Sequence, residues 1–97
     1  MTGYLVANID VHDPVLFQKY REQVPAIIAA HGGRYIIRGG ALDQVEGNFP
    51  KPRLVVLEFP SLEAARRFYD SPEYQPVKKL RMDSARSDIA FVEGWTG

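Results

Sequence analysis

The stretch that decides the fold is RLVVLEFPSLEAARRFY, residues 53–69. Its first seven residues are rich in β-branched and aromatic side chains, which predicts a strand over residues 53–59. Pro60-Ser61 then predicts the start of a helix, because a serine hydroxyl can cap the first turn and Glu63 lies near the positive end of the helix dipole. The apolar stripe of this helix consists of Leu62, Ala65 and Phe68/Tyr69.

The chain before this strand–helix unit supplies a strand, a helix and a second strand. Residues 3–11 and 34–38 both have strand composition. Between them, Asp13 can cap a helix that begins at Pro14 and stops at Gly32-Gly33. Pro25 inside this helix predicts a kink. The expected apolar stripe is Leu16, Tyr20, Val24 and Ile27.

The remaining stretches of the chain carry weaker signals. Residues 41–46 predict a continuation of the second strand, and residues 47–52 predict a loop because prolines cannot donate to a sheet ladder. Ser71-Pro72-Glu73 is a second capping signal, and Val77, Leu80 and Ser84 share a helical face after it. Pro76 leaves open either a broken helix or a turn followed by a helix. Residues 88–93 predict the last strand.

The resulting order, β-α-β-β-α-β, predicts a ferredoxin-like α+β domain over residues 1–97. In this pattern one antiparallel sheet carries both helices on one face. A chain of 97 residues buries only about 60–65% of its unfolded surface, so a monomer would have a thin core.

Composition excludes several classes of function. Twelve basic residues balance twelve acidic ones, which argues against general nucleic-acid binding. The absence of cysteine excludes disulfides, thiolate zinc sites and a thiol nucleophile. No signal peptide pattern or apolar run of about 20 residues is present, so no membrane partner and a cytoplasmic location are expected.

Strand alternation sorts the predicted sheet into two faces. One face is suited to a helix-covered core and collects Leu5, Ala7, Ile9, Tyr35, Ile37, Val55, Leu57 and Phe59. The other, here called the open face, is too apolar for water and too polar for a dry core; it collects Tyr4, Val6, Asn8, Arg34, Ile36, Arg38, Leu54, Val56, Glu58, Phe91 and Glu93, with Phe91 able to belong to either face. This predicts a homodimer in which two open faces meet and enclose a partly polar interior.

The open face is also the predicted site. If the first and third strands are central, Asn8 and Glu58 should lie side by side with Arg38 nearby. Glu58 and Arg38 can form a structural ion pair. Alternatively, burial raises the pKa of Glu58 and lets it bind a ligand or take a proton from it. Arg34 and Arg38 can clamp an oxyanion, or pair with Glu58, Glu46 or Asp10.

Other candidates lie near helix ends. His31 is expected either to interact with a helix C-terminus or to enter a site. Tyr69 and Tyr74 are expected to pack at a helix junction or to edge a pocket. Catalysis is therefore assigned to Glu58 and His31, and ligand binding to Asn8, Arg34, Arg38, Tyr69 and Tyr74. Two distant histidines give no metal site, no cofactor is expected, and Lys78, Lys79, Arg81 and Arg86 predict a solvated basic surface.

Several motifs in order carry a family resemblance. They are Gly32-Gly33-Arg34-Tyr35, Arg38-Gly39-Gly40, Val55-Val56-Leu57-Glu58-Phe59-Pro60-Ser61, Ala64-Ala65, Phe68-Tyr69 and Ser71-Pro72-Glu73-Tyr74-Gln75. Over nearly the whole chain the sequence resembles the "domain of unknown function 1330" family of the dimeric α+β barrel superfamily. The resemblance implies a ferredoxin-like subunit and a homodimer. It implies no reaction, since the wider superfamily includes cofactor-independent monooxygenases, dehydratases and haem-degrading proteins.

Three functions are compatible with these observations. The leading one is a dimeric barrel that binds a small, partly apolar, oxyanion-bearing molecule and acts on it by cofactor-free proton transfer or oxygenation. The second is a non-catalytic binding or regulatory module, and the third is a structural dimer whose interior is filled by its own side chains.

Overall fold

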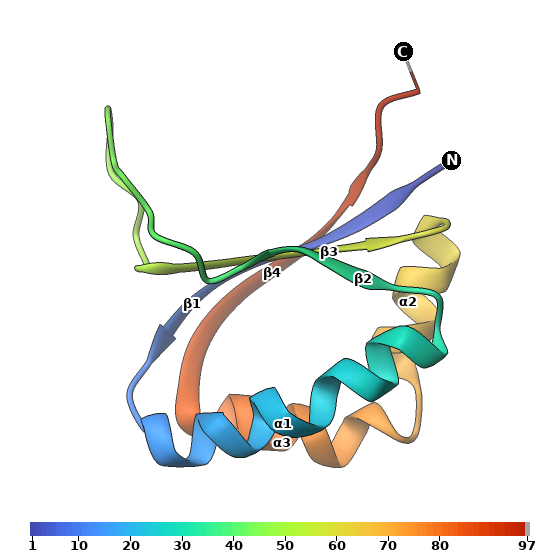
Figure 1. Ribbon diagram of the computed structural model, residues 1–97, viewed down its shortest axis with the longest axis horizontal. Coiled ribbons are helices and arrows are strands. Elements are labelled where there is room, and N and C mark those ends of the chain that lie inside the picture. Colours follow the sequence, from blue (N-terminus) through green and yellow to red (C-terminus); the bar gives the residue numbers. More distant parts are fainter. Residues whose placement is uncertain (97) are drawn as a thin grey trace.

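The computed structural model describes residues 1–96, in which four antiparallel strands form one sheet and three helices lie against one of its faces (Figure 1). The elements are β1 (Gly3–Val11), α1 (Pro14–Ala30), β2 (Arg34–Arg38), β3 (Arg53–Phe59), α2 (Leu62–Asp70), α3 (Tyr74–Ser84) and β4 (Ala85–Glu93). The strand order is β2-β3-β1-β4, so the first and third strands are central. The predicted ferredoxin-like fold is confirmed, with two helices instead of one in the second crossover.

Two of the three predicted capping signals act as expected, whereas Ser71 is the C-cap of α2, donates its hydroxyl to the carbonyl of Phe68, and leaves α3 without a side-chain cap. The Asp13 carboxylate accepts a hydrogen bond from the backbone N–H of Leu16 (3.1 Å), and the Ser61 hydroxyl accepts one from Ala64 (3.0 Å). Helix α1 continues through Pro25 and ends where Gly32 adopts a φ of +76°, a left-handed conformation that favours glycine.

Two predicted boundaries need correction, and one open alternative is decided in favour of a turn followed by a helix. Residues 41–46 form no strand. Helix α3 begins at Tyr74, so Pro76 lies in the first turn, where its missing N–H breaks no helical hydrogen bond. Strand β4 begins at Ala85 instead of residue 88, because Ala85 pairs with Val11 of β1 and this pairing outweighs a weak local preference for strand.

The core lies between the sheet and the helices. As predicted, Leu5, Ala7, Ile9, Leu57 and Phe59 of the sheet are buried there. The buried residues of α1 are Phe17, Val24 and Ile28, of which only Val24 was in the predicted stripe. Tyr20 and Ile27 of that stripe are partly buried against the core. Helix α1 therefore presents positions 17, 21, 24 and 28 to the sheet, and α3 presents Tyr74, Val77, Arg81 and Ser84.

A change of register in β2 alters the expected faces. The pairing with β3 shifts between Tyr35 and Ile37, so Ile37 lies opposite Val56 and Arg38 lies opposite Val55. Ile37 is therefore on the open face and Arg38 on the helix side, the reverse of the prediction. On β4, Phe91 lies opposite Leu5 and Glu93 opposite Gly3, so these two also belong to the helix side.

No helix covers the open face, and the loop before β3 and the segment after β4 both rise on that side of the sheet (Figure 1). Tyr4, Val6, Asn8, Leu54, Val56 and Glu58 are only half-buried there. Val45 and Phe49 in the loop and Trp95 after β4 are exposed apolar side chains. In the described part of the chain, no helix has the length and apolarity needed to cross a membrane.

Candidate functional site: an arginine-lined cavity

The carboxylate predicted to be catalytic is part of an ion pair on the open face. Glu58 accepts hydrogen bonds from Arg34 Nε (2.9 Å) and Tyr4 Oη (3.2 Å), and Arg34 Nη2 lies 2.9 Å from the same carboxylate. The hydrogen bond to Glu58 raises the pKa of Tyr4. The partner of Glu58 is thus Arg34, one of the alternatives considered, and not Arg38.

Asn8 and Glu58 do not lie side by side as predicted. Asn8 is opposite Leu54, whereas Glu58 is opposite Tyr4 near the other end of the strand pair. Because β1 and β3 run antiparallel, Asn8 and Glu58 share one face of the sheet but lie near opposite ends of the strand pair. The Asn8 amide donates to the backbone carbonyls of Lys51 (3.0 Å) and Arg53 (3.2 Å), which fastens the start of β3.

His31 lies in the helix layer, on the other side of the sheet from Glu58. It is the C-cap of α1, where its Nδ1 donates to the carbonyl of Ile27 (3.0 Å) and its Nε2 lies 3.4 Å from a Glu73 carboxylate oxygen. The structure therefore does not bring the two predicted catalytic residues together, and their catalytic role stays a prediction.

Two predicted ligand-binding residues, Arg38 and Tyr74, do meet, in a cavity between the sheet and the helices. The space open to the centre of a water molecule is about 30 Å³, enough for a pair of waters or one small polar group. Its polar lining consists of four arginines and three tyrosines: Arg21, Arg38, Arg53, Arg81, Tyr20, Tyr35 and Tyr74. The rest is apolar and includes Leu5, Phe17, Leu57, Phe68 and Ile89.

Four different elements direct these arginines inward. Arg21 is half-buried on the helical face that also carries the buried Phe17, Val24 and Ile28, and Arg53 has the same strand parity as the buried Leu57 and Phe59. The shifted register of β2 turns Arg38 to the same side. Arg81 lies seven residues after Tyr74 on the buried stripe of α3 and is itself only 5% exposed.

Arg21, Arg38 and Arg53 form what we call the arginine cluster. Arg38 Nη2 donates to the backbone carbonyl of Arg21 (3.0 Å), and its guanidinium carbon lies 4.6 Å from the centre of the Tyr35 ring. The Arg53 guanidinium carbon lies 5.4 Å from the centre of the Phe17 ring. Gly39 leaves the room for it, because a Cβ there would lie 2.5 Å from the Arg53 guanidinium.

No acidic side chain balances these charges. The cavity lining contains no Asp or Glu, and none of the four ion pairs within residues 1–96 involves a cavity arginine. The Nε atoms of Arg21, Arg53 and Arg81 are buried without a hydrogen-bond partner. Burial, together with the charges of Arg21 and Arg38, lowers the pKa of Arg53. Buried charges are costly unless they are paired, so this arrangement is suited to a bound anion.

The tyrosines of the cavity are hydrogen-bond donors. Tyr20 and Tyr74 hydroxyls lie 2.9 Å apart. Burial, followed by the proximity of Tyr74, raises the pKa of Tyr20 well above 10, and burial also raises the pKa of Tyr35. These hydroxyls keep their protons near neutral pH. Because no His, Asp or Glu lines the cavity, it can hold and stabilise negative charge but contains no side chain suited to act as a general base.

The remaining predicted ligand-binding residue, Tyr69, lines a wider hollow of about 380 Å³ between α3 and β4. It packs against Tyr74 and Phe91 at ring-centre distances of 5.7 and 5.8 Å. Among residues 1–96, no group of three His, Cys, Asp or Glu side chains is placed to hold a metal ion.

Sequence reasoning missed Arg21, Arg53 and Arg81 as site residues. Arg81 was expected on a solvated basic face and is buried. Its spacing from Tyr74 and Val77 matches a buried helical stripe, and Arg53 alternates correctly with Leu57 and Phe59, so both signals were present. They were overlooked because arginine is rarely assigned to a core.

Comparison with known proteins supports the fold. The model of the family described as a domain of unknown function (DUF1330) matches residues 2–95. No curated protein sequence matches. A protein of unknown function from Rhodopseudomonas palustris, RPA0582, has a similar structure: the TM-score is 0.78 at 14% identity, covering 99% of this chain and 84% of that one.

Two further solved structures share the fold at low identity. SnoaB from Streptomyces nogalater, named as a cofactor-independent oxygenase, gives a TM-score of 0.67 at 16% identity, with 99% of this chain and 95% of that one covered. Rv0793 from Mycobacterium tuberculosis gives 0.57 at 16% identity, with 100% and 98% covered.

Proposed function

The chain belongs to the DUF1330 family, a domain of unknown function, and from its cavity we propose that it binds a small molecule that carries an anionic group on an apolar body. The observation that carries this proposal is the set of unpartnered, buried Nε atoms on Arg21, Arg53 and Arg81 in a cavity without an acid. Since guanidinium groups match planar oxyanions, a carboxylate or enolate is the preferred anionic group.

The ligand's apolar part follows from the rest of the lining. Phe17, Ile28, Leu57 and Phe68 surround the same cavity. The enclosed space holds only the anionic group, so a larger ligand needs rearrangement at the cavity mouth. Arg38 is exposed and is the side chain best placed to move.

A second candidate function is catalysis by oxyanion stabilisation. Reactions that pass through an enolate or phenolate are accelerated by fixed donors and cations around the developing charge, and the arginines and protonated tyrosines supply both. The fold shared with SnoaB, named as a cofactor-independent oxygenase, is compatible with such chemistry. With no general base in the lining, the substrate would have to enter already ionised or lose its proton to water.

We also propose that the open face is covered by a second copy of this chain. Its main charged pair, Arg34–Glu58, is already satisfied within the subunit, and the surface around Val6, Leu54 and Val56 is apolar. Exposed Phe49 and Trp95 flank the face on the two segments that rise beside it. An identical face offers the same apolar surface and the same flanking segments, which suits a two-fold contact.

Calorimetric titration with benzoate and straight-chain carboxylates tests the binding proposal. The wild-type protein should bind one carboxylate per subunit, and Arg53→Met should weaken binding by about tenfold or more because charged hydrogen bonds are lost. Arg67→Met, which removes an exposed arginine of α2, controls for net charge and should leave affinity unchanged. Binding that survives Arg53→Met but is lost in Glu58→Gln would move the site to the open face and overturn the proposal.

A further inference from the structure

Arg81 lies apart from the arginine cluster. The charges that act on Arg53 are those of Arg21 and Arg38, whereas the groups around Arg81 are the hydroxyls of Tyr74, Tyr20 and Tyr69. Burial lowers the pKa of Arg81, but its interactions with Tyr74 and Tyr20 outweigh this effect and leave the pKa raised. Arg81 therefore remains charged although it is buried, and no acidic side chain lines the cavity beside it to supply a counter-charge.

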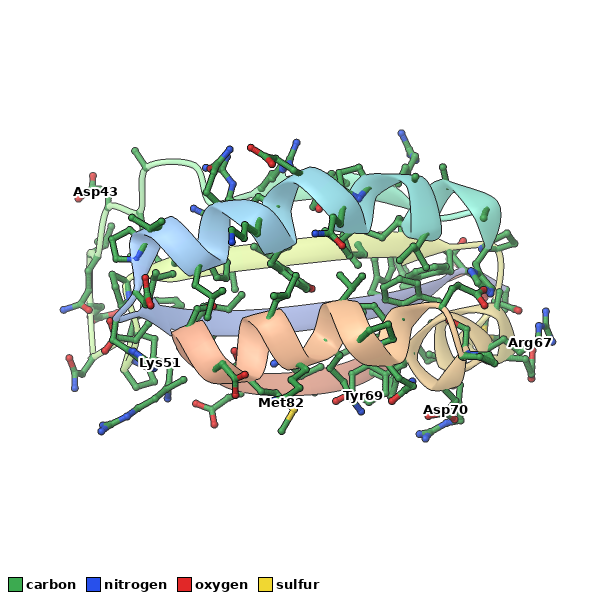
Figure 2. All side chains as sticks on the ribbon, turned by 90° about the horizontal axis from the view of Figure 1, so that it is seen from below. Asp43, Lys51, Arg67, Tyr69, Asp70 and Met82 are labelled. Carbon is green, nitrogen blue, oxygen red and sulfur yellow. The ribbon has the colours of Figure 1, made fainter. Side chains whose placement is uncertain are left out.

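Arg81 also forms part of the wall between two hollows. Together with Ile89 it lines both the enclosed cavity and the wider hollow between α3 and β4. Two other residues of the wider hollow, Tyr69 and Met82, lie along one edge of the helix layer in Figure 2. Arg81 therefore borders both the cavity that holds the arginine cluster and the hollow on the β4 side.

Three polar groups beside this wall have unused donor capacity. Arg81 Nε and Ser87 Oγ are buried without a hydrogen-bond partner. The Tyr20 and Tyr74 hydroxyls share one hydrogen bond between them, so one of the two protons remains free to donate. Buried donors without acceptors are costly, and each of these groups is able to donate to an additional oxygen acceptor.

We propose that Arg81, Ser87 and the Tyr20–Tyr74 pair form a second oxyanion subsite, so that the natural ligand is a dicarboxylate-like molecule with an apolar spacer. One carboxylate group occupies the arginine cluster and the other lies beside Arg81. Apolar Ile89, which lines both hollows, faces the spacer. This inference rests on the proposed function, since it assumes that the first carboxylate binds the arginine cluster.

Calorimetric titration with matched monocarboxylates and α,ω-dicarboxylates of increasing chain length tests the subsite. At one spacer length, the dicarboxylate should bind the wild-type protein about tenfold or more tightly than the monocarboxylate of the same length. In Arg81→Met, which keeps much of the side-chain volume, this ratio should fall to about one. In Arg53→Met both ligands should bind weakly.

A measurement on the wild-type protein tests the same subsite without relying on variants that fail to fold. In ¹H–¹⁵N spectra of arginine side chains, the dicarboxylate should shift the Nε–H resonance of Arg81, and the monocarboxylate should shift those of the arginine cluster alone. Monocarboxylate binding without any dicarboxylate preference or Arg81 shift would overturn the second subsite and leave the proposed function standing. If neither ligand binds, the proposed function fails as well.

Discussion

Arg81 is 5% exposed, and its Nε has no hydrogen-bond partner among residues 1–96. A buried guanidinium without a carboxylate destabilises the free protein, because the interactions with Tyr74 and Tyr20 replace its lost hydration only in part. Arg81→Met should therefore raise the free energy of unfolding by about 1–3 kcal/mol in the absence of ligand. Urea unfolding measures this change, and the exposed Arg67→Met should alter stability by less than about 0.5 kcal/mol. A large loss of stability in Arg81→Met would mean that the interactions of the guanidinium with these tyrosines outweigh the cost of burying it.

Tyr20 predicts a dependence of stability on pH. Its pKa is raised well above 10 in the folded protein, mainly by burial. The folded state therefore keeps this proton at pH values where the unfolded chain has already lost it. The contribution of this proton to the free energy of unfolding is present below pH 10 and is lost as the pH rises above that value. Between about pH 8 and about pH 11 the free energy of unfolding should fall less steeply in Tyr20→Phe than in the wild type. Equal slopes would contradict the burial of this hydroxyl.

At the scale of elements, the short connection after β2 shapes the arginine cluster. Gly39 has a φ of +67°, and a Cβ there would lie 2.5 Å from the Arg53 guanidinium. Gly47 has a similar φ of +72° with no atom within 4 Å of its would-be Cβ. Replacing either by alanine should cost roughly 1–2 kcal/mol of backbone strain. Only Gly39→Ala should also weaken carboxylate binding, because it displaces Arg53; an equal effect on binding in both variants would contradict this role.

The elements also show where sequence reasoning succeeds. Residues 3–11, 34–38 and 53–59 were assigned correctly because strand composition and alternation agree with the pairing that the sheet imposes. The faces were misassigned at Arg38, since the shift of register in β2 depends on how it pairs with β3 and has no local signature beyond Gly39-Gly40. This single shift moved a predicted site residue from one side of the sheet to the other.

The candidate site was less predictable than the fold. Charged side chains in the core contradict the expectation that arginine faces water, and only the packed structure shows that Arg21, Arg53 and Arg81 converge. Glu58 was predicted to be catalytic because it is a carboxylate on the partly apolar open face. Its pairing with Arg34 follows from the strand register, which the sequence does not specify.

At the scale of the whole molecule, the uncovered sheet face predicts self-association. Val56 is half-buried at the centre of that face, opposite Val6 of β1. Val56→Lys should place an unpaired charge in the contact and convert a dimer of 11.0 kDa subunits into monomers or insoluble protein. Val15→Lys on α1, where the side chain is 76% exposed, is the matched control and should remain dimeric. Sedimentation at several concentrations distinguishes these results, and a wild-type monomer would refute the contact.

The proposed anion site is the cavity between the sheet and the helices, and not the open face. The most direct test is a ¹H–¹⁵N titration that follows arginine Nε–H groups while benzoate is added. Saturable shifts are expected for Arg21 and Arg53, with the exposed Arg67 unaffected. Saturable shifts confined to Arg34 on the open face, with Arg21 and Arg53 unchanged, would contradict it.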